Sequence, residues 1–308
     1  MKHLTSIHDL TETNILSLFE LASSLKKTPA LKIKLSLNHK IIAVMFFQPS
    51  TRTRLGFEVA TLRMGGNIIG FADPSVTRLT DYIGESFLDS VQVIAQMSDC
   101  IIIRHFKIGA AKQAADVSPV SIINAGDGAN EHPVQALSDL WLIHEHLGGV
   151  RGAAIGIAGN PGFRVLRSLI YALIKAKVGK LLFLLPLDVK LSDEIRAELV
   201  SSRIKYDFCA SIDELLSVAD AIEIMPLEIP DLNADPKTLR PQNFQTPEWF
   251  RLTKSKIQRT HSRTLILHPG PRRDELDLDT DGLPNSLYFT QVKESLYMRM
   301  AVLHQLLC

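Results

Sequence analysis

The chain has 308 residues, enough for two domains of ordinary size, and 46% of them are hydrophobic while 22% are charged. The formal net charge is +1 and no long run of one sign occurs, so we expect no nucleic acid and no membrane as partner. The first residues lack the apolar core of a signal peptide, and the three cysteines are scattered, so we expect a cytoplasmic protein.

Hydrophobic periodicity predicts alternating helices and strands in the first half of the chain. In chain order we expect a helix around 15–25, a strand at 40–47, a helix at 51–64, a strand at 67–71, a helix at 85–97, a strand at 100–104, a helix at 110–115, a strand at 120–124 and a helix at 134–147. Residues 72–82 include a proline and have no period, so we expect a loop there. Gly148 and Gly149 end the last helix and mark the predicted domain boundary.

The second half repeats the alternation of strands and helices. We expect a strand at 153–158, a helix at 163–175, a strand at 180–185, a helix at 192–201, a strand at 205–209, a helix at 212–218, a strand at 221–225, a short helix near 247–252, a strand at 264–267 and a helix at 291–306. This alternation in both halves predicts an α/β protein with two parallel-sheet domains.

The first candidate site follows the strand at 40–47. Ser50 is in the position of an N-cap, where its hydroxyl can accept from the first turn of the next helix. The free amides there, with the positive end of the helix dipole, suit a bound anion. Arg52 and Arg54 offer guanidinium groups for phosphate oxygens, and Thr51 and Thr53 offer hydroxyls. The alternative is an ordinary helix start with two solvated arginines, but its position after a buried strand favours phosphate.

Two further candidates follow in the first half. Arg104 ends a buried strand, where parallel sheets open onto ligands, although an arginine simply leaving the core is also common. His132 begins a helix, so a neutral imidazole there could donate to a carbonyl oxygen, and Gln135 lies one turn later on the same face. A capping arrangement without chemistry is the alternative for this pair.

The second half contributes a turn and a stiff loop. The turn after the strand at 153–158 lacks the glycine spacing of a dinucleotide site, but Arg164 on the next helix suits a carboxylate or, equally, solvent. In the loop after the strand at 264–267, Gly270 allows a ligand to approach the backbone closely, and its bond to Pro271 is a candidate for the cis form. A rigid structural turn is the alternative there.

Four segments, in this order along the chain, resemble the aspartate/ornithine carbamoyltransferase family. They are Ser50-Thr51-Arg52-Thr53-Arg54, Arg104-His105, His132-Pro133-Val134-Gln135 and His268-Pro269-Gly270-Pro271-Arg272-Arg273-Asp274-Glu275. Within the family the chain resembles the aspartate branch, that of the aspartate carbamoyltransferase catalytic chain. The ornithine branch has a cysteine after the equivalent histidine, whereas Pro269 follows His268 here.

The resemblance implies a domain organisation and partners. Residues 1–148 would bind carbamoyl phosphate, residues 149–288 would bind aspartate or another amino acid, and residues 289–308 would form a helix that packs back on the first domain. The family also implies a homotrimer with active sites at subunit interfaces, acting in pyrimidine biosynthesis. Whether a regulatory chain binds is left open by the sequence.

The resemblance further implies roles for the matching residues of the donor site. The phosphate of carbamoyl phosphate would be held by Ser50, Thr51, Arg52 and Thr53. Its carbonyl oxygen would be polarised by Thr53, Arg104 and His132.

The remaining roles concern the amino groups and the acceptor. Gln135 and the backbone of Gly270 and Pro271 would hold the carbamoyl amino group, and Arg164 would bind a carboxylate of aspartate. The amine of the acceptor attacks the carbonyl carbon, and the leaving phosphate can take its proton. We therefore expect no metal and no cofactor.

Two departures from the family pattern concern the acceptor. The family loop before a Gly-Glu-Ser/Thr triplet carries a lysine, whereas residues 72–83 of this chain contain one cation, Arg78. The aspartate branch places an arginine and a glutamine after the strand at 221–225, where this chain has Pro226 and Glu228. Arg78, Pro226 and Glu228 are thus the candidates for an altered acceptor site.

Three hypotheses follow from these departures. In the first hypothesis, the chain is a working aspartate carbamoyltransferase in which Arg78 or another cation replaces the lost contacts. Alternatively it carbamoylates a different amine, for which Glu228 would favour a cationic one. In the third hypothesis it is a non-catalytic paralogue that binds a phosphorylated ligand or partners a catalytic subunit.

Overall fold

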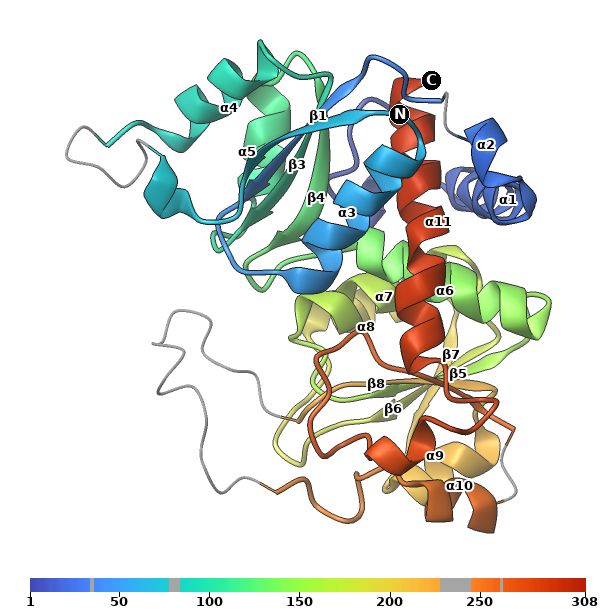
Figure 1. Ribbon diagram of the computed structural model, residues 1–308. Helices are drawn as coiled ribbons and strands as arrows, with labels where there is room; N and C mark the ends of the chain where they lie inside the picture. Colours follow the sequence, from blue (N-terminus) through green and yellow to red (C-terminus); the bar gives the residue numbers. More distant parts are fainter. Residues whose placement is uncertain (34–35, 78–83, 228–244, 261–262) are drawn as a thin grey trace. The chain divides into compact units, whose positions relative to one another are not determined.

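The computed structural model describes residues 1–33, 36–77, 84–227, 245–260 and 263–308. Contacts divide the chain into two compact units, one of Met1–Ser138 with Glu294–Cys308 and the other of Asp139–Lys293 (Figure 1). Each unit contains one parallel sheet with helices, so the predicted fold class is confirmed. In the described residues, no helix is long and apolar enough to cross a membrane.

The first unit is built on a four-stranded parallel sheet in the order β2-β1-β3-β4. Its strands are β1 (Ile41–Phe46), β2 (Asn67–Phe71), β3 (Cys100–His105) and β4 (Ser121–Asp127). Its helices are α1 (Glu12–Lys27), α2 (Ala30–Ile33), α3 (Thr51–Arg63), α4 (Phe87–Ala95) and α5 (Ala110–Val117), with short 3-10 turns at Ile7–Asp9 and Pro74–Val76. Apolar residues of α4 and α5 pack on one face of the sheet, and Figure 1 shows α3 on the other.

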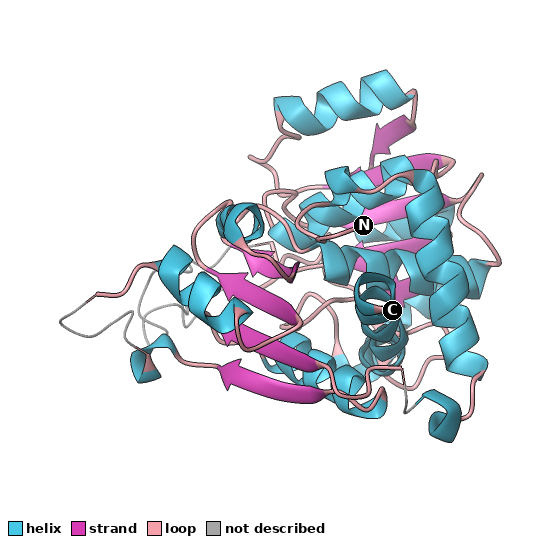
Figure 2. Ribbon diagram, turned by 90° about the horizontal axis from the view of Figure 1, so that it is seen from above, coloured by secondary structure: helices cyan, strands magenta, loops and turns pink. Residues whose placement is uncertain are grey.

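The second unit is built on a five-stranded parallel sheet in the order β7-β6-β5-β8-β9. Its strands are β5 (Ala154–Ala158), β6 (Lys180–Leu184), β7 (Lys205–Phe208), β8 (Ala221–Ile224) and β9 (Leu265–Leu267). Its helices are α7 (Arg164–Lys175), α8 (Asp193–Ser202), α9 (Ile212–Val218) and α10 (Lys254–Arg259), with a 3-10 turn at Leu278–Thr280. Figure 2 shows the strands of each sheet as arrows that run in a common direction.

Two long helices have residues in both units. They are α6 (Pro133–Leu147) and α11 (Tyr288–Leu307). The C-terminal part of α11 belongs to the first unit, where Lys26 of α1 forms an ion pair of 2.8 Å with Glu294. The predicted return of the C-terminal helix to the first domain is therefore confirmed, although the helix begins at Tyr288, three residues before the predicted start.

The strand orders place a switch point in each sheet. In the first unit the chain winds outward from β1 to β2 and then returns to β3 on the other side of β1. In the second unit it winds from β5 to β6 and β7, and then returns to β8 on the other side of β5. In folds with such a reversal, ligands bind in the crevice outside the carboxyl ends of the two strands that flank the switch, which here are β1 and β3, and β5 and β8.

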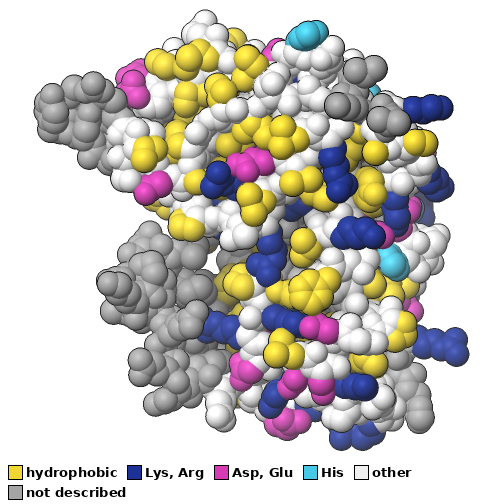
Figure 3. All heavy atoms as spheres, viewed as in Figure 1, with side chains coloured by type: hydrophobic (Ala, Val, Ile, Leu, Met, Phe, Trp, Pro, Cys, Tyr) yellow, Lys and Arg dark blue, Asp and Glu magenta, His cyan; other side chains and the backbone are white. Residues whose placement is uncertain are grey.

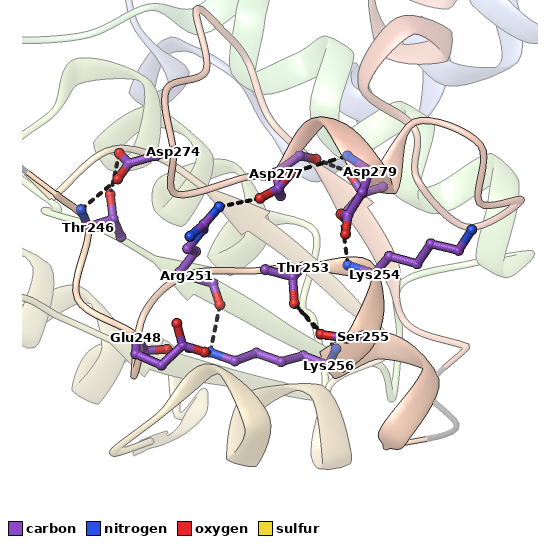
Figure 4. Close-up of polar contacts among 11 residues, drawn as sticks. Thr246, Glu248, Arg251, Thr253, Lys254, Ser255, Lys256, Asp274, Asp277 and Asp279 are labelled. Atoms are coloured by element: carbon purple, nitrogen blue, oxygen red, sulfur yellow. Dashed lines mark hydrogen bonds and ion pairs between the residues drawn. The ribbon is translucent and has the colours of Figure 1, made fainter.

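The segment before α10 differs from the prediction. The expected short helix near 247–252 is a turn, and the helix lies at Lys254–Arg259 instead. Polar contacts replace helical ones in this segment, as Figure 4 shows: buried Lys256 donates to the carbonyl oxygen of Arg251 at 2.9 Å, and Thr246 donates twice to Asp274 at 2.7 Å. The bonds of Thr246 to Asp274 tie the segment to the chain that follows the loop at 268–272.

Candidate functional site

The helix α3 follows β1, one of the two strands that flank the reversal of winding in the first sheet. Its N-terminus therefore lies at the carboxyl end of β1. Ser50 is its N-cap residue, as predicted, but the side chain makes no capping hydrogen bond. Its ψ of 106° differs from the 157° and 162° of Ser192 and Ser211, whose hydroxyls do cap their helices. The hydroxyl of Ser50 is therefore not used to cap α3, and the amides of the first turn keep their partial positive charge.

The side chains that follow differ in their surroundings. Thr51 is exposed, Arg52 is half-buried and Thr53 is buried. Arg54 donates to Glu58 one turn later at 2.7 Å, so its guanidinium is engaged on the surface of the helix. Of the two arginines in this motif, Arg54 is thus held in an ion pair along α3.

Arg104 is the penultimate residue of β3 and lies beside the last residue of β1. The register pairs it with Phe46, and its carbonyl oxygen accepts from the amide of Phe47 at 2.8 Å. Its guanidinium donates to the carbonyl oxygen of Ala125 in β4 at 3.3 Å. The switch point of the first sheet therefore carries Arg104 on one side and the start of α3 on the other.

A contact between two separate motif segments completes this group. The Oγ1 atom of Thr53 and the Nε2 atom of His132 lie 3.2 Å apart, and both side chains are buried. His132 directly precedes α6, and its carbonyl oxygen accepts from the amide of Gln135 at 3.1 Å. Gln135 is itself buried. The structure thus brings together the hydroxyl of Thr53 and the imidazole of His132, groups that can both donate to an anionic ligand.

An aromatic cluster supports these loops and was not predicted. The imidazole of His105 lies 4.6 Å from the ring centroid of Phe47, 4.8 Å from that of Phe87 and 4.3 Å from that of Phe106. Its Nδ1 accepts from the amide of Lys107 at 2.9 Å, so the proton of the neutral ring is on Nε2. The cluster joins the residue after β1 to the start of α4 and to the end of β3.

In the second unit, Arg164 is the first residue of α7, after β5. The preceding turn is fixed by Asn160, whose side-chain oxygen accepts from the amide of Gly162 at 2.8 Å. Pro226 lies half-buried just after β8, on the other side of the same switch point. The predicted site residues Arg78 and Glu228 lie outside the described residues.

The loop at 268–272 is held from within. Its Gly270–Pro271 peptide bond is cis, which confirms the prediction, and Gly270 has a φ of 72°, a value that favours glycine. The amide of Gly270 donates to Nδ1 of His268 at 2.8 Å. Because Nδ1 accepts, Nε2 carries the proton and donates to Glu275 at 2.7 Å. Both side chains of this pair are buried.

Comparison with known proteins gives the class and then the family. The fold and the two switch points define a two-domain α/β protein with a phosphate-type site in its first unit. The family model for the aspartate/ornithine carbamoyltransferase carbamoyl-P binding domain matches residues 2–145, and that for the Asp/Orn binding domain matches residues 151–306. The chain belongs to the aspartate/ornithine carbamoyltransferase family.

Individual relatives match over the full length. The aspartate carbamoyltransferase catalytic subunit of Methanocaldococcus jannaschii is 35% identical over 100% of this chain and 98% of its own. The aspartate carbamoyltransferase catalytic subunit of Wigglesworthia glossinidia brevipalpis is 36% identical, and the match covers 99% of this chain and 96% of that protein.

Solved structures agree with the fold of both units. The M. jannaschii aspartate transcarbamoylase catalytic subunit has a TM-score of 0.87 at 34% identity, covering 99% of this chain and 98% of that one. The Trypanosoma cruzi aspartate transcarbamoylase in complex with carbamoyl phosphate and aspartate has a TM-score of 0.88 at 26% identity, covering 100% and 96%.

We expect His105 to make the protein less stable in acid. Burial, with a smaller contribution from the charge of Lys107, lowers the pKa of His105 from about 6.5 to about 4. Between these pH values the unfolded chain binds a proton that the folded chain does not, so the free energy of unfolding falls as the pH falls through this range. The variant His105→Phe keeps an aromatic ring in the cluster and should flatten this slope in denaturant titrations.

The control is His146→Phe, at an exposed position of α6, which should leave the slope as it is in the wild type. An unchanged slope in His105→Phe would contradict the assignment of this proton to His105.

Proposed function

We propose that the chain is an aspartate carbamoyltransferase, which transfers the carbamoyl group of carbamoyl phosphate to the amine of L-aspartate. The observation that carries the proposal is the 3.2 Å contact of Thr53 with His132. It joins the helix start after β1 to the motif that opens α6. Arg104 stands at the end of the neighbouring strand.

The donor site in this proposal is the N-terminus of α3. The groups that hold the phosphate are Ser50, Thr51, Arg52 and Thr53. A helix N-terminus attracts an anion through its free amides and its dipole, and a guanidinium adds paired hydrogen bonds to phosphate oxygens. The hydroxyl of Ser50, which does not cap the helix, supports this role.

The same site activates the carbonyl group. Thr53, Arg104 and His132 donate to the carbonyl oxygen, which becomes an oxyanion when the amine attacks the carbon. Each such donor stabilises the transition state by on the order of 3 kcal/mol. The bond from carbon to the phosphate oxygen then breaks, and the leaving phosphate takes the proton from the amine. Placing the two substrates in attack geometry lowers the barrier by a comparable or larger amount.

The remaining groups position the two amino groups and the acceptor. Gln135 holds the carbamoyl amino group, and the backbone of Gly270 and Pro271 holds it as well. Arg164, at the start of α7, binds a carboxylate of aspartate, which the helix dipole also favours.

A second candidate function is transfer to a different amine. It is favoured by Pro226, which stands at the carboxyl end of β8 where the aspartate branch has an arginine. Loss of a bidentate partner for a carboxylate removes a few kcal/mol of binding free energy. A non-catalytic protein that binds a phosphorylated ligand is the third candidate.

The proposal includes a homotrimer with sites at subunit interfaces, in pyrimidine biosynthesis in the cytoplasm. Support for a subunit interface comes from α3, whose residues Leu55, Val59 and Leu62 are exposed and recur on one face of the helix. Figure 3 shows hydrophobic side chains at the surface among charged ones on this side of the molecule. Three free cysteines are consistent with a reducing compartment.

The activity test combines the purified full chain with carbamoyl phosphate and a panel of amines. We expect carbamoyl-aspartate as the product, identified by mass spectrometry. Product with a different amine alone would select the second candidate function. Absence of any product, while phosphate still raises the melting temperature, would leave the non-catalytic one.

Arg52→Ala should weaken the binding of inorganic phosphate by about tenfold or more, because a charge-assisted hydrogen bond contributes roughly 1.5–3 kcal/mol. Isothermal titration measures this. The control Arg63→Ala removes the same charge from an exposed position at the far end of α3 and should change the affinity little. Equal affinities for phosphate in Arg52→Ala and the wild type would refute the site at α3.

A further inference from the structure

Two buried acids face one amide in the second unit. Glu223 lies in β8, and its strand neighbours are the apolar residues Ile157 in β5 and Leu267 in β9. Asp139 lies in α6. Both acidic side chains are 0% exposed, a position in which an acid survives only with a proton or a partner.

Gln291 of α11 connects the two acids to the functional loop. Its Nε2 donates to Asp139 at 2.6 Å and lies 3.4 Å from Oε1 of Glu223. Its Oε1 accepts from the backbone amide of His268 at 2.8 Å. These contacts fix the orientation of the amide, because a flipped Gln291 would present oxygen to the acids and nitrogen to a donor.

The surroundings of Glu223 disfavour its charged form. Burial raises the pKa of Glu223 well above its ordinary value, the charge of Asp139 raises it further, and the hydrogen bond from Gln291 lowers it. No lysine or arginine of the described residues pairs with Glu223. Its other oxygen, Oε2, has no hydrogen-bond partner there either, so the neutral acid is much less costly than the anion.

We propose that Gln291 is a positioning residue for the Gly270–Pro271 backbone, held in place by its hydrogen bonds to the two acids. The inference rests on the proposed function, in which this backbone holds the carbamoyl amino group. The acids fix the nitrogen of the Gln291 amide, and its oxygen accepts from the backbone amide of His268.

The consequence is specific for one part of the ligand. His268 holds Gly270 through its Nδ1, so a shift at the start of the loop is passed to the Gly270–Pro271 backbone. A misplacement of about 1 Å in a binding group can cost about a hundredfold in rate. Inorganic phosphate, which would bind at α3, does not need this backbone.

The test compares two ligands on the full chain by isothermal titration. Gln291→Met keeps the volume of the side chain but neither donates nor accepts, and should weaken carbamoyl phosphate about tenfold or more while inorganic phosphate changes less than about twofold. The matched control Gln305→Met makes the same replacement at an exposed position of α11 and should change neither affinity.

The outcomes separate the two proposals. If Gln291→Met weakens both ligands equally or neither, the positioning role is wrong while the donor site stands. Where Gln291→Met does not fold, Gln291→Asn decides: its shorter side chain cannot span the acids and His268, so it should also weaken carbamoyl phosphate selectively, and unchanged affinities for both ligands would overturn the positioning role. If the wild type binds neither ligand, the proposed function is wrong and the positioning role falls with it.

Discussion

The structure depends on one topological constraint, the reversal of winding within each parallel sheet. Parallel strands need crossover connections, and where the winding reverses, two neighbouring loops leave the carboxyl edge in opposite directions. In the first unit this happens between β1 and β3, and in the second between β5 and β8. The helix start at Ser50, Arg104 and Arg164 lie at the carboxyl ends of β1, β3 and β5, so their placement is a consequence of strand order, whereas His132 follows β4 and Gly270 follows β9.

The two switch points have different chemical characters. The first combines a helix N-terminus, Arg104 and the pair of Thr53 with His132, a set of donors with few acceptors that suits a compact anion. The second has Arg164 at the start of α7, but Pro226 offers no donor on the other side of the crevice. The donor substrate is therefore better specified by this chain than the acceptor.

Periodicity predicted most of the helices and strands, because amphipathic and buried segments differ in period even without neighbours. It was wrong near 247–252, where the buried residue Phe250 belongs to a turn, and the segment bonds to a distant part of the chain through Thr246 with Asp274 and Leu252 with Glu275. The N-cap position of Ser50 was predictable, whereas the direction of its hydroxyl depends on a ψ angle that no local pattern gives. The link from Glu223 to His268 through Gln291 joins residues far apart in the chain, and the only local signal was an acid within an apolar strand.

The central claim is that the N-terminus of α3 binds the phosphate of carbamoyl phosphate. A crystal structure of the full chain with carbamoyl phosphate bound tests it most directly. We expect that crystal structure to show phosphate oxygens within about 3 Å of the first-turn amides of α3 and of Arg52. The carbonyl oxygen should lie near Thr53 and His132. A phosphate bound elsewhere, with these groups in contact only with solvent, would contradict it.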